Sequence, residues 1–223
     1  MHPRIPIAVP LLILALAQTA AAQTRTVGPE LEVYFKREIS DWRPEGAGKV
    51  ETRINRVGVL VRDHVAEGLW IGLHGGYLGL TQSGNPATRG MNLTGWHLGT
   101  SVRWRFLHAE SMSVSLLGQY TYNEADDAAD GQSTAYDWHE YGAGLETAVR
   151  LDRVRLRLGV DYTAVDGDER TRGLIRDTRS ISEDEAISAR AALDLLVDAT
   201  GRITFQVEAG GRRGAGIWFA RQF

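Results

Sequence analysis

The sequence predicts an all-β fold, a transmembrane antiparallel up-and-down β-barrel of about ten strands, on three observations. Segments in which apolar and polar side chains alternate follow one another along nearly the whole chain. The apolar face of one such segment begins with Trp96 and ends with Phe106. Long polar connections alternate with short turns. Together these features are typical of a barrel whose apolar exterior contacts lipid.

Residues 92–106 carry the clearest alternation. Successive side chains of a strand point to opposite faces, so this segment has one apolar face and one small or cationic face. About ten residues tilted by about 40° cover about 25 Å, which matches the apolar band of a membrane barrel. The apolar face holds Trp96, Leu98, Thr100, Val102, Trp104 and Phe106, and the other face holds Gly95, His97, Gly99, Ser101, Arg103 and Arg105.

The same alternation predicts ten strands in chain order. We expect them at about 30–39, 51–62, 69–81, 92–106, 112–122, 137–150, 154–162, 185–197, 203–209 and 215–223. The apolar positions that define them are, for example, Leu31, Val33 and Phe35 in the first; Val57, Val59 and Val61 in the second; Leu69, Ile71 and Leu73 in the third; Met112, Val114 and Leu116 in the fifth; Tyr141, Leu145 and Val149 in the sixth; Leu156, Leu158 and Val160 in the seventh; Ile187, Leu193 and Leu195 in the eighth; Ile203, Phe205 and Val207 in the ninth; and Ile217 and Phe219 in the tenth.

The connections between these strands alternate in length. Four polar segments, residues 40–49, 82–91, 124–135 and 166–184, are expected to be long loops on one side of the membrane. The turns after the second, fourth, sixth and eighth strands are short. The connection after the ninth strand is short where a long one is expected, so eight and twelve strands remain alternatives to ten.

The bulk composition excludes several function classes. The 223 residues carry a net charge of −3 and a pI of about 6.1, so nothing favours a nucleic-acid partner. The chain has no cysteine, which excludes disulfides and thiolate metal sites or nucleophiles. A mean hydropathy of −0.23 fits a soluble protein, and it also fits a barrel that exposes only alternate residues to lipid.

The N-terminus has the pattern of a cleaved signal peptide. A short basic head with Arg4 precedes an apolar stretch, and small residues precede Gln23. Pro6 and Pro10 argue against a membrane anchor. We therefore expect export, with a signal peptide at residues 1–22, a short periplasmic lead at 23–29 and the barrel at 30–223.

The polar faces of the predicted strands supply charges of both signs. In barrels of about eight strands the side chains fill the interior, whereas open aqueous channels appear at about sixteen strands. We therefore expect the charges to pair across the lumen and largely plug it; a narrow pore lined by the same charges is the alternative. The residues are Arg56, His97, Arg103, Arg105, Glu140, Glu146, Arg155, Arg157, Asp161, Arg190, Asp194 and Glu208.

The C-terminus ends on an aromatic strand, GIWFARQF, and with it the chain after residue 22 resembles the bacterial outer-membrane β-barrel proteins. In that family the C-terminal aromatic strand is the signal read by the barrel-assembly machinery, which the resemblance assigns here to Phe219 and Phe223. Arg221 departs from the pattern, which has an apolar residue there. The resemblance implies an outer-membrane location and contact with outer-membrane lipids and lipopolysaccharide. We expect a monomer without cofactor, and no metal site, because the six histidines are scattered and show no metal-ligand spacing.

The loop predicted after the seventh strand is rich in arginine. Arg170, Arg172, Arg176 and Arg179 could meet lipopolysaccharide phosphates through charge-assisted hydrogen bonds, because guanidinium groups bind phosphate well. An ordinary solvated loop is the competing interpretation. We expect a structural or surface-interaction role for the barrel.

Two catalytic hypotheses compete with that role. Outer-membrane proteases of the omptin family use Asp–His and Asp–Asp pairs at the rim of a ten-stranded barrel, and lipid A deacylases use Ser, His and Glu. This chain has the residue types but no motif of either family, so we expect no enzyme; a rim hydrolase remains the third hypothesis. The residues concerned are Asp137, His139, Asp126 and Asp127 for the protease, and His108, Glu110 and Ser111 for the deacylase.

Overall fold

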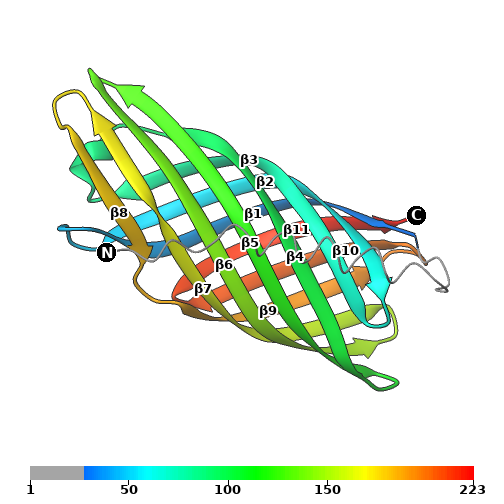
Figure 1. Ribbon diagram of the computed structural model, residues 1–223. Helices are drawn as coiled ribbons and strands as arrows, with labels where there is room; N and C mark the ends of the chain where they lie inside the picture. Colours follow the sequence, from blue (N-terminus) through cyan, green and yellow to red (C-terminus); the bar gives the residue numbers. More distant parts are fainter. Residues whose placement is uncertain (1–27) are drawn as a thin grey trace.

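The computed structural model describes residues 28–223 as a closed β-barrel (Figure 1). The predicted signal peptide and most of the predicted lead lie outside the described residues. No helix among residues 28–223 is long and apolar enough to cross a membrane. The elements are β1 (Glu30–Pro44), β2 (Val50–Ala66), β3 (Leu69–Ser83), a 3-10 helix η1 (Pro86–Thr88), β4 (Leu93–His108), β5 (Met112–Ala129), β6 (Gln132–Leu151), β7 (Val154–Arg172), β8 (Asp177–Glu183), β9 (Ile187–Leu196), β10 (Gly201–Gly210) and β11 (Arg212–Gln222).

The eleven strands occupy ten positions around one antiparallel barrel, because β8 and β9 share one position. β11 pairs with β1 and closes the ring. β8 pairs with the second half of β7, from Asp166, and β9 pairs with the first half of β7, up to Tyr162. β8 and β9 therefore lie end to end along β7 and together take the place of one interrupted strand. This confirms the predicted up-and-down barrel of about ten strands.

The ring is narrower at one end than at the other. Both described ends of the chain lie at the terminal end, where the Phe223 amide donates to the Pro29 carbonyl over 3.1 Å. β11 accompanies β1 only as far as the pair Ser40 and Arg212. Beyond that point, β1 pairs directly with β8 from Trp42 to Pro44. The barrel therefore has ten strands at the terminal end and eight at the opposite, hairpin end.

The strands at the hairpin end extend well past the predicted limits. The predicted loops 124–135 and 166–184 are mostly strand, because β5, β6 and β7 continue their ladders to two tall hairpins (Figure 1). Asp130 (φ 50°) and Gly131 (φ 76°) make the two-residue turn between β5 and β6, which needs positive φ at both positions. The prediction was wrong here because the outward face of these extensions is polar, so the alternation of apolar residues stops while the hydrogen bonds continue.

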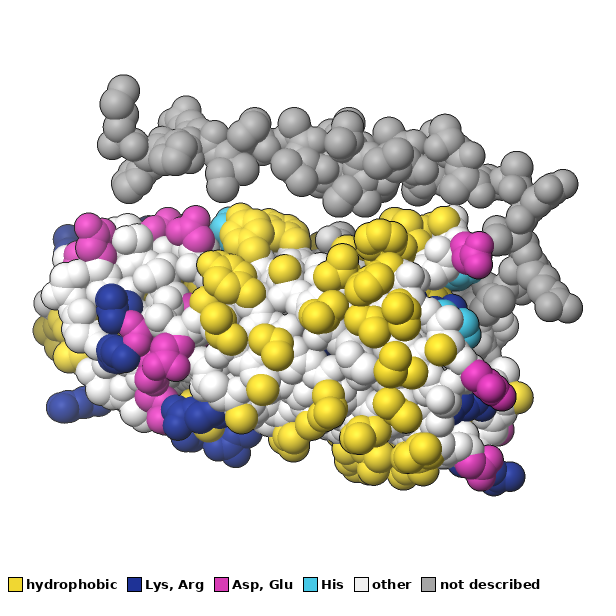
Figure 2. Space-filling model, turned by 90° about the horizontal axis from the view of Figure 1, so that it is seen from below, with side chains coloured by type: hydrophobic (Ala, Val, Ile, Leu, Met, Phe, Trp, Pro, Cys, Tyr) yellow, Lys and Arg dark blue, Asp and Glu magenta, His cyan; other side chains and the backbone are white. Residues whose placement is uncertain are grey.

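The barrel exterior carries an apolar band (Figure 2). Hydrophobic side chains gather over the middle and the terminal end, with charged side chains beyond the band on both sides. Following paired residues from Trp96 through Tyr77, Val57 and Phe35 around the ring leads to Met112 on β5. Trp96 itself pairs with Glu124, twelve residues from Met112 along β5. An offset of twelve residues around ten strands means that the strands are tilted by about 40° from the barrel axis. From Trp96, each step across to the next strand in this row of paired residues therefore moves about 3 Å along the axis toward the terminal end.

The same tilt shows at which height along the barrel axis the ring changes from ten strands to eight. The tip of the β10–β11 hairpin, at Gly210 to Arg212, lies within about 3 Å of the height of Trp96. Trp96 marks the border of the band toward the hairpin end, where Tyr120, Tyr122 and Tyr141 also lie on the outer surface. The ten-stranded section is thus the section with the apolar exterior, and the eight-stranded section stands beyond the band.

Candidate functional site in the barrel lumen

The interior of the eight-stranded section is filled with apolar side chains. Trp42 and Trp138 meet edge to face at its centre, with ring centroids 5.3 Å apart and exposed fractions of 1% and 0%. Met91, which follows η1, packs into the same cluster. We call this cluster the apolar plug; its members are Trp42, Ile54, Leu78, Leu80, Met91, Leu93, Ala125, Tyr136, Trp138, Val165 and Ile181.

One carboxylate is buried against the apolar plug and is fully supplied with partners. Glu169 accepts hydrogen bonds from the Tyr136 hydroxyl at 2.6 Å and the Asn85 amide at 3.0 Å, and pairs with Arg179 at 2.6 Å. Burial, and then the negative charge of Glu169, raise the pKa of Tyr136 above its usual range. The phenol therefore stays neutral and donates a hydrogen bond to the carboxylate.

A first group of ion pairs lies next to the apolar plug, on the side that faces the terminal end. Arg212 reaches Glu140 at 2.9 Å, Glu38 at 3.2 Å and Glu183 at 2.8 Å. Arg56 also pairs with Glu38 and Glu140. The Trp138 indole donates to Glu140 over 2.9 Å, so this group is joined to the plug. We call Lys36, Glu38, Arg56, Glu140, Glu183 and Arg212 the upper ion cluster.

A second group of ion pairs lies nearer the terminal end. Arg157 bridges Glu146 at 3.1 Å and Asp194 at 2.9 Å. Arg103 pairs with Glu146 at 3.0 Å, and Arg155 pairs with Asp194 at 2.6 Å. We call Arg103, Glu146, Arg155, Arg157, Arg190 and Asp194 the lower ion cluster. A further set, Glu30, Glu32, Arg62 and Arg202, joins β1, β2 and β10 through four ion pairs of 2.8 to 2.9 Å.

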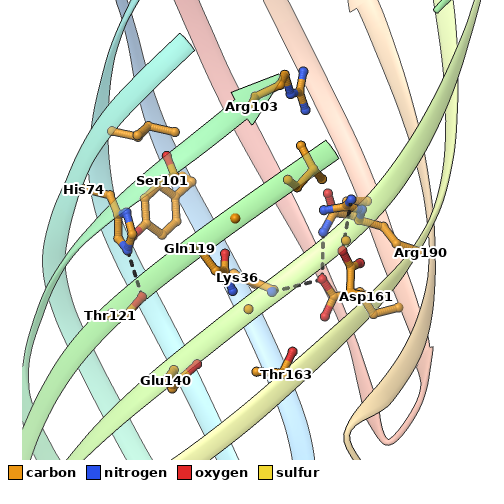
Figure 3. Close-up of a pocket in the computed structure, with 18 of the residues that line it drawn as sticks. Lys36, His74, Ser101, Arg103, Gln119, Thr121, Glu140, Asp161, Thr163 and Arg190 are labelled. Carbon is orange, nitrogen blue, oxygen red and sulfur yellow. Dashed lines mark hydrogen bonds and ion pairs between the residues drawn. The ribbon is translucent and has the colours of Figure 1, made fainter. Parts of the chain in front are cut away.

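A polar cavity of about 220 Å³ extends between the two clusters (Figure 3). His74 lies on one side, where its Nε2 is 3.0 Å from the Thr121 hydroxyl, and Asp161 and Arg190 lie on the other side, 3.3 Å apart. His97, 2% exposed, places Nε2 2.6 Å from the Tyr34 hydroxyl. Most charged groups around this cavity have an opposite charge within reach, so the cavity has few unpaired charges to offer a solute.

The predicted lumen residues fall into three kinds of surroundings. Ten of them form ion pairs inside the barrel, and His97 is held by Tyr34. Arg105 differs, because it lies at the end of β4 beside a register shift and its guanidinium stacks 4.9 Å over the ring of Trp70. The ten are Arg56, Arg103, Glu140, Glu146, Arg155, Arg157, Asp161, Arg190, Asp194 and Glu208.

Sequence reasoning missed several partners of these residues. Arg212 lies in a segment expected to be a turn, and Glu183 lies in a segment expected to be a loop. Lys36 and Glu38 could have been found, because Lys36 alternates with Phe35 on the first strand. The pairing of β8 with β1, which brings Glu183 to Arg212, has no signal in the local pattern.

Most of the remaining predicted residues lie on the outer surface or at the hairpin end, and His108, Glu110 and Ser111 lie at the turn between β4 and β5 at the terminal end. Phe219 and Phe223 are 50% and 71% exposed on the apolar band. Of the four arginines assigned to the loop, Arg170 pairs with Asp137, Arg179 pairs with Glu169, and Arg172 and Arg176 are exposed. His139 Nδ1 lies 2.8 Å from the Tyr120 hydroxyl on the barrel wall. Among residues 28–223 no three His, Asp or Glu side chains are grouped to hold a metal ion.

The comparisons with known proteins give the fold and no family. No family model matches the chain, and no curated protein matches its sequence. The outer-membrane protease OmpT from Escherichia coli is similar in structure, with a TM-score of 0.54 and 10% identity over 92% of this chain and 100% of that chain. The translocator domain of the autotransporter NalP from Neisseria meningitidis has a TM-score of 0.53 and 10% identity over 96% of this chain and 95% of that chain. This protein therefore has the fold of the bacterial outer-membrane β-barrel proteins.

Proposed function

We propose that the protein is a closed, non-conducting barrel of the bacterial outer membrane that presents its eight-stranded section outside the cell. Outer-membrane barrels have short periplasmic turns and longer extracellular loops. The terminal end, with its short turns at residues 66–69, 108–112 and 151–154, is accordingly the periplasmic side. The exposed Phe223 at that end remains our candidate for the signal read by the assembly machinery.

The observation that carries the proposal is the apolar plug. A pore needs a continuous wet path, but the eight-stranded section has side chains of 0 to 5% exposure across its interior. Below the plug, Arg56 and Arg212 are held by carboxylates from several strands. Opening the lumen would require removing the plug and also separating buried opposite charges, which is strongly unfavourable.

The eight-stranded section gives the barrel a surface for interaction. β5 and β7 continue for about 20 Å beyond the border of the apolar band, estimated from the rise and tilt of the strands. The outward faces of β5, β6 and β7 in this part carry charges of both signs, among them Asp126, Asp137, Asp166, Asp168 and Arg170. A rigid, charged projection on a sealed barrel supports a structural or surface-binding role.

Single-channel recording in a planar bilayer tests the proposal. We expect no discrete conductance steps from the refolded protein, with insertion verified by the mobility difference between unheated and heated protein on a denaturing gel. A large open porin in the same bilayers serves as the positive control. Discrete steps whose size changes when Arg103, Arg105 and Arg157 are neutralised would establish the narrow-pore alternative instead.

A further inference from the structure

Three arginines interrupt the aromatic border of the apolar band on one side of the barrel. On β4, β5 and β6 that border is formed by Trp96, Tyr120, Tyr122 and Tyr141. On β1, β2 and β11 the outward positions at the same height are Arg37, Arg53 and Arg213. The tilt of the strands places all three within about 4 Å of the height of Trp96.

The register brings the three arginines around one residue. Ile39 pairs with Arg53 on β2 and with Arg213 on β11, so the three stand in one row. Arg37 is two residues from Ile39 on the same face of β1 and directly follows the apolar positions Val33 and Phe35. Neighbouring strands lie about 4.8 Å apart, so the three Cα atoms form a triangle with sides of about 8 to 10 Å. Arginine side chains are long enough to reach a single anion from Cα atoms that are this far apart.

The charge of this triangle is not neutralised within the described chain. Arg53 and Arg213 share one carboxylate, Glu51, each at a distance of 3.6 Å, beyond hydrogen-bond length. Arg37 is exposed and forms no ion pair with any residue of 28–223. Asp41 and Glu51 form the next outward-facing pair beyond Ile39 and Arg53, on the side away from the apolar band. The edge of the triangle that faces the band is therefore positive.

We propose that Arg37, Arg53 and Arg213 bind a phosphate group of an outer-leaflet glycolipid, of the lipopolysaccharide class, whose acyl chains lie along the apolar face of β1, β2 and β11. Val33, Phe35, Val57, Val59 and Phe219, 42% to 58% exposed, form that face. Guanidinium groups bind phosphate in paired, charge-assisted hydrogen bonds. A lipid phosphate, unlike a free phosphate, is held at the border of the band by its own chains. This inference rests on the proposed orientation, with the hairpin end outside.

The location differs from the loop suggested by the sequence. There Arg170 and Arg179 are already paired with Asp137 and Glu169. Arg172 and Arg176 are exposed near the tip of the β7–β8 hairpin, about 20 Å beyond the band, where no acyl chain reaches. Those arginines therefore serve as controls for charge alone.

The test compares R37Q/R53Q/R213Q with the matched control R89Q/R172Q/R176Q, which removes the same charge from exposed arginines outside the band. Refolded proteins in detergent micelles are titrated with bisphosphorylated lipid A and with the same lipid after removal of its phosphates, and native mass spectrometry gives the Kd values. We expect the wild type and the control to bind the phosphorylated lipid about tenfold or more tightly than the phosphate-free lipid. The triple variant should lose that preference.

Two results would overturn the inference. One is a preference for the phosphorylated lipid that R37Q/R53Q/R213Q retains or that the control loses equally, with both variants folded by the heat-dependent gel mobility. The other is displacement of the lipid by millimolar inorganic phosphate, which would mean a site for free phosphate. Conductance is recorded separately, so a barrel that conducts but keeps the arginine-dependent preference would contradict the proposed function alone.

Discussion

The ten-stranded section of this barrel has a charged interior and an apolar exterior, whereas the eight-stranded section has an apolar interior and a polar exterior. Most of the same strands build both sections. On β6 the inward positions Glu140 and Glu146 belong to the ion clusters, while Trp138, on the same face, belongs to the apolar plug. On the outward face Leu145 is 48% exposed in the band, while Asp137 pairs with Arg170 beyond it. β2 makes the same change, from Arg56 inside and Val57 outside to Ile54 inside and Arg53 outside.

The difference shows that the solvent outside each section selects which face is apolar. Lipid favours apolar side chains on the exterior, which leaves the polar face inside, where its charges must pair. Water outside the eight-stranded section allows an ordinary apolar core. The border falls where the β10–β11 hairpin ends, so the change in packing coincides with the loss of two strands.

The largest expected effect is in the upper ion cluster. Arg212→Leu removes the cation shared by Glu38, Glu140 and Glu183, and leaves their buried charges undercompensated. We expect the free energy of unfolding to fall by about 3 to 5 kcal/mol. Urea unfolding of the refolded protein, followed by gel mobility, measures it. Arg105→Leu removes a lumen arginine without an ion pair in the described chain and should cost less than about 1 kcal/mol; equal losses would contradict the account.

The next effect is in the apolar plug. Trp138→Ala opens a cavity among fully buried side chains and removes the hydrogen bond to Glu140, so we expect a loss of about 3 to 4 kcal/mol. Trp104→Ala is the matched control, because that ring is 49% exposed on the band. The control should lose less than half as much in the same urea experiment. A reversed order would mean that the plug does not pack as a core.

A smaller effect should be seen at the buried phenol of the plug. Tyr136→Phe removes the hydroxyl that donates to Glu169, at an expected cost of about 2 kcal/mol at neutral pH. Because the pKa of Tyr136 is raised in the folded protein, its contribution is complete below the unfolded value of about 10 and is lost as the pH rises further. The wild type should therefore lose stability relative to Tyr136→Phe above pH of about 10, and parallel pH profiles would argue against this assignment.

The smallest effect is expected at the junction between β8 and β9. Asp184 pairs with Lys49 and Arg43, and the hydrogen bond from Lys49, followed by the nearby charge of Arg43, lowers the pKa of this carboxylate. Its contribution is present above the unfolded pKa of about 3.9 and is lost as the pH falls below it. Asp184→Asn should lower the urea midpoint slightly at pH 6, and this difference from the wild type should shrink progressively as the pH falls below about 3.9. A difference that stays the same size from pH 6 down to pH 2 would have another cause.

The sequence predicts the ten-stranded section well and the eight-stranded section poorly, for a physical reason. In the band every second residue faces lipid, so Leu156, Leu158 and Val160 mark β7 directly. Past Tyr162 the outward residues include Asp166 and Asp168, which are typical of loops, and β7 nevertheless continues to Arg172.

The side chains inside the barrel were likewise predictable only in the ten-stranded section. The residues of the lower ion cluster alternate with the lipid-facing residues and could be identified. The junction of β8 with β1 and the arginine triangle depend on register between strands that are distant in the sequence, which alternation within one strand does not specify.

The reversal between the two sections can be measured directly on β5, because the chain contains no cysteine. Leu116 and Ala128 lie on the same outward face, Leu116 in the band and Ala128 near the hairpin tip. Single-cysteine variants at these positions carry a fluorophore and are quenched by a lipid-bound or a water-soluble quencher in liposomes. The account predicts lipid quenching at residue 116 and aqueous quenching at residue 128. Lipid quenching at both positions, or aqueous quenching at both, would contradict it.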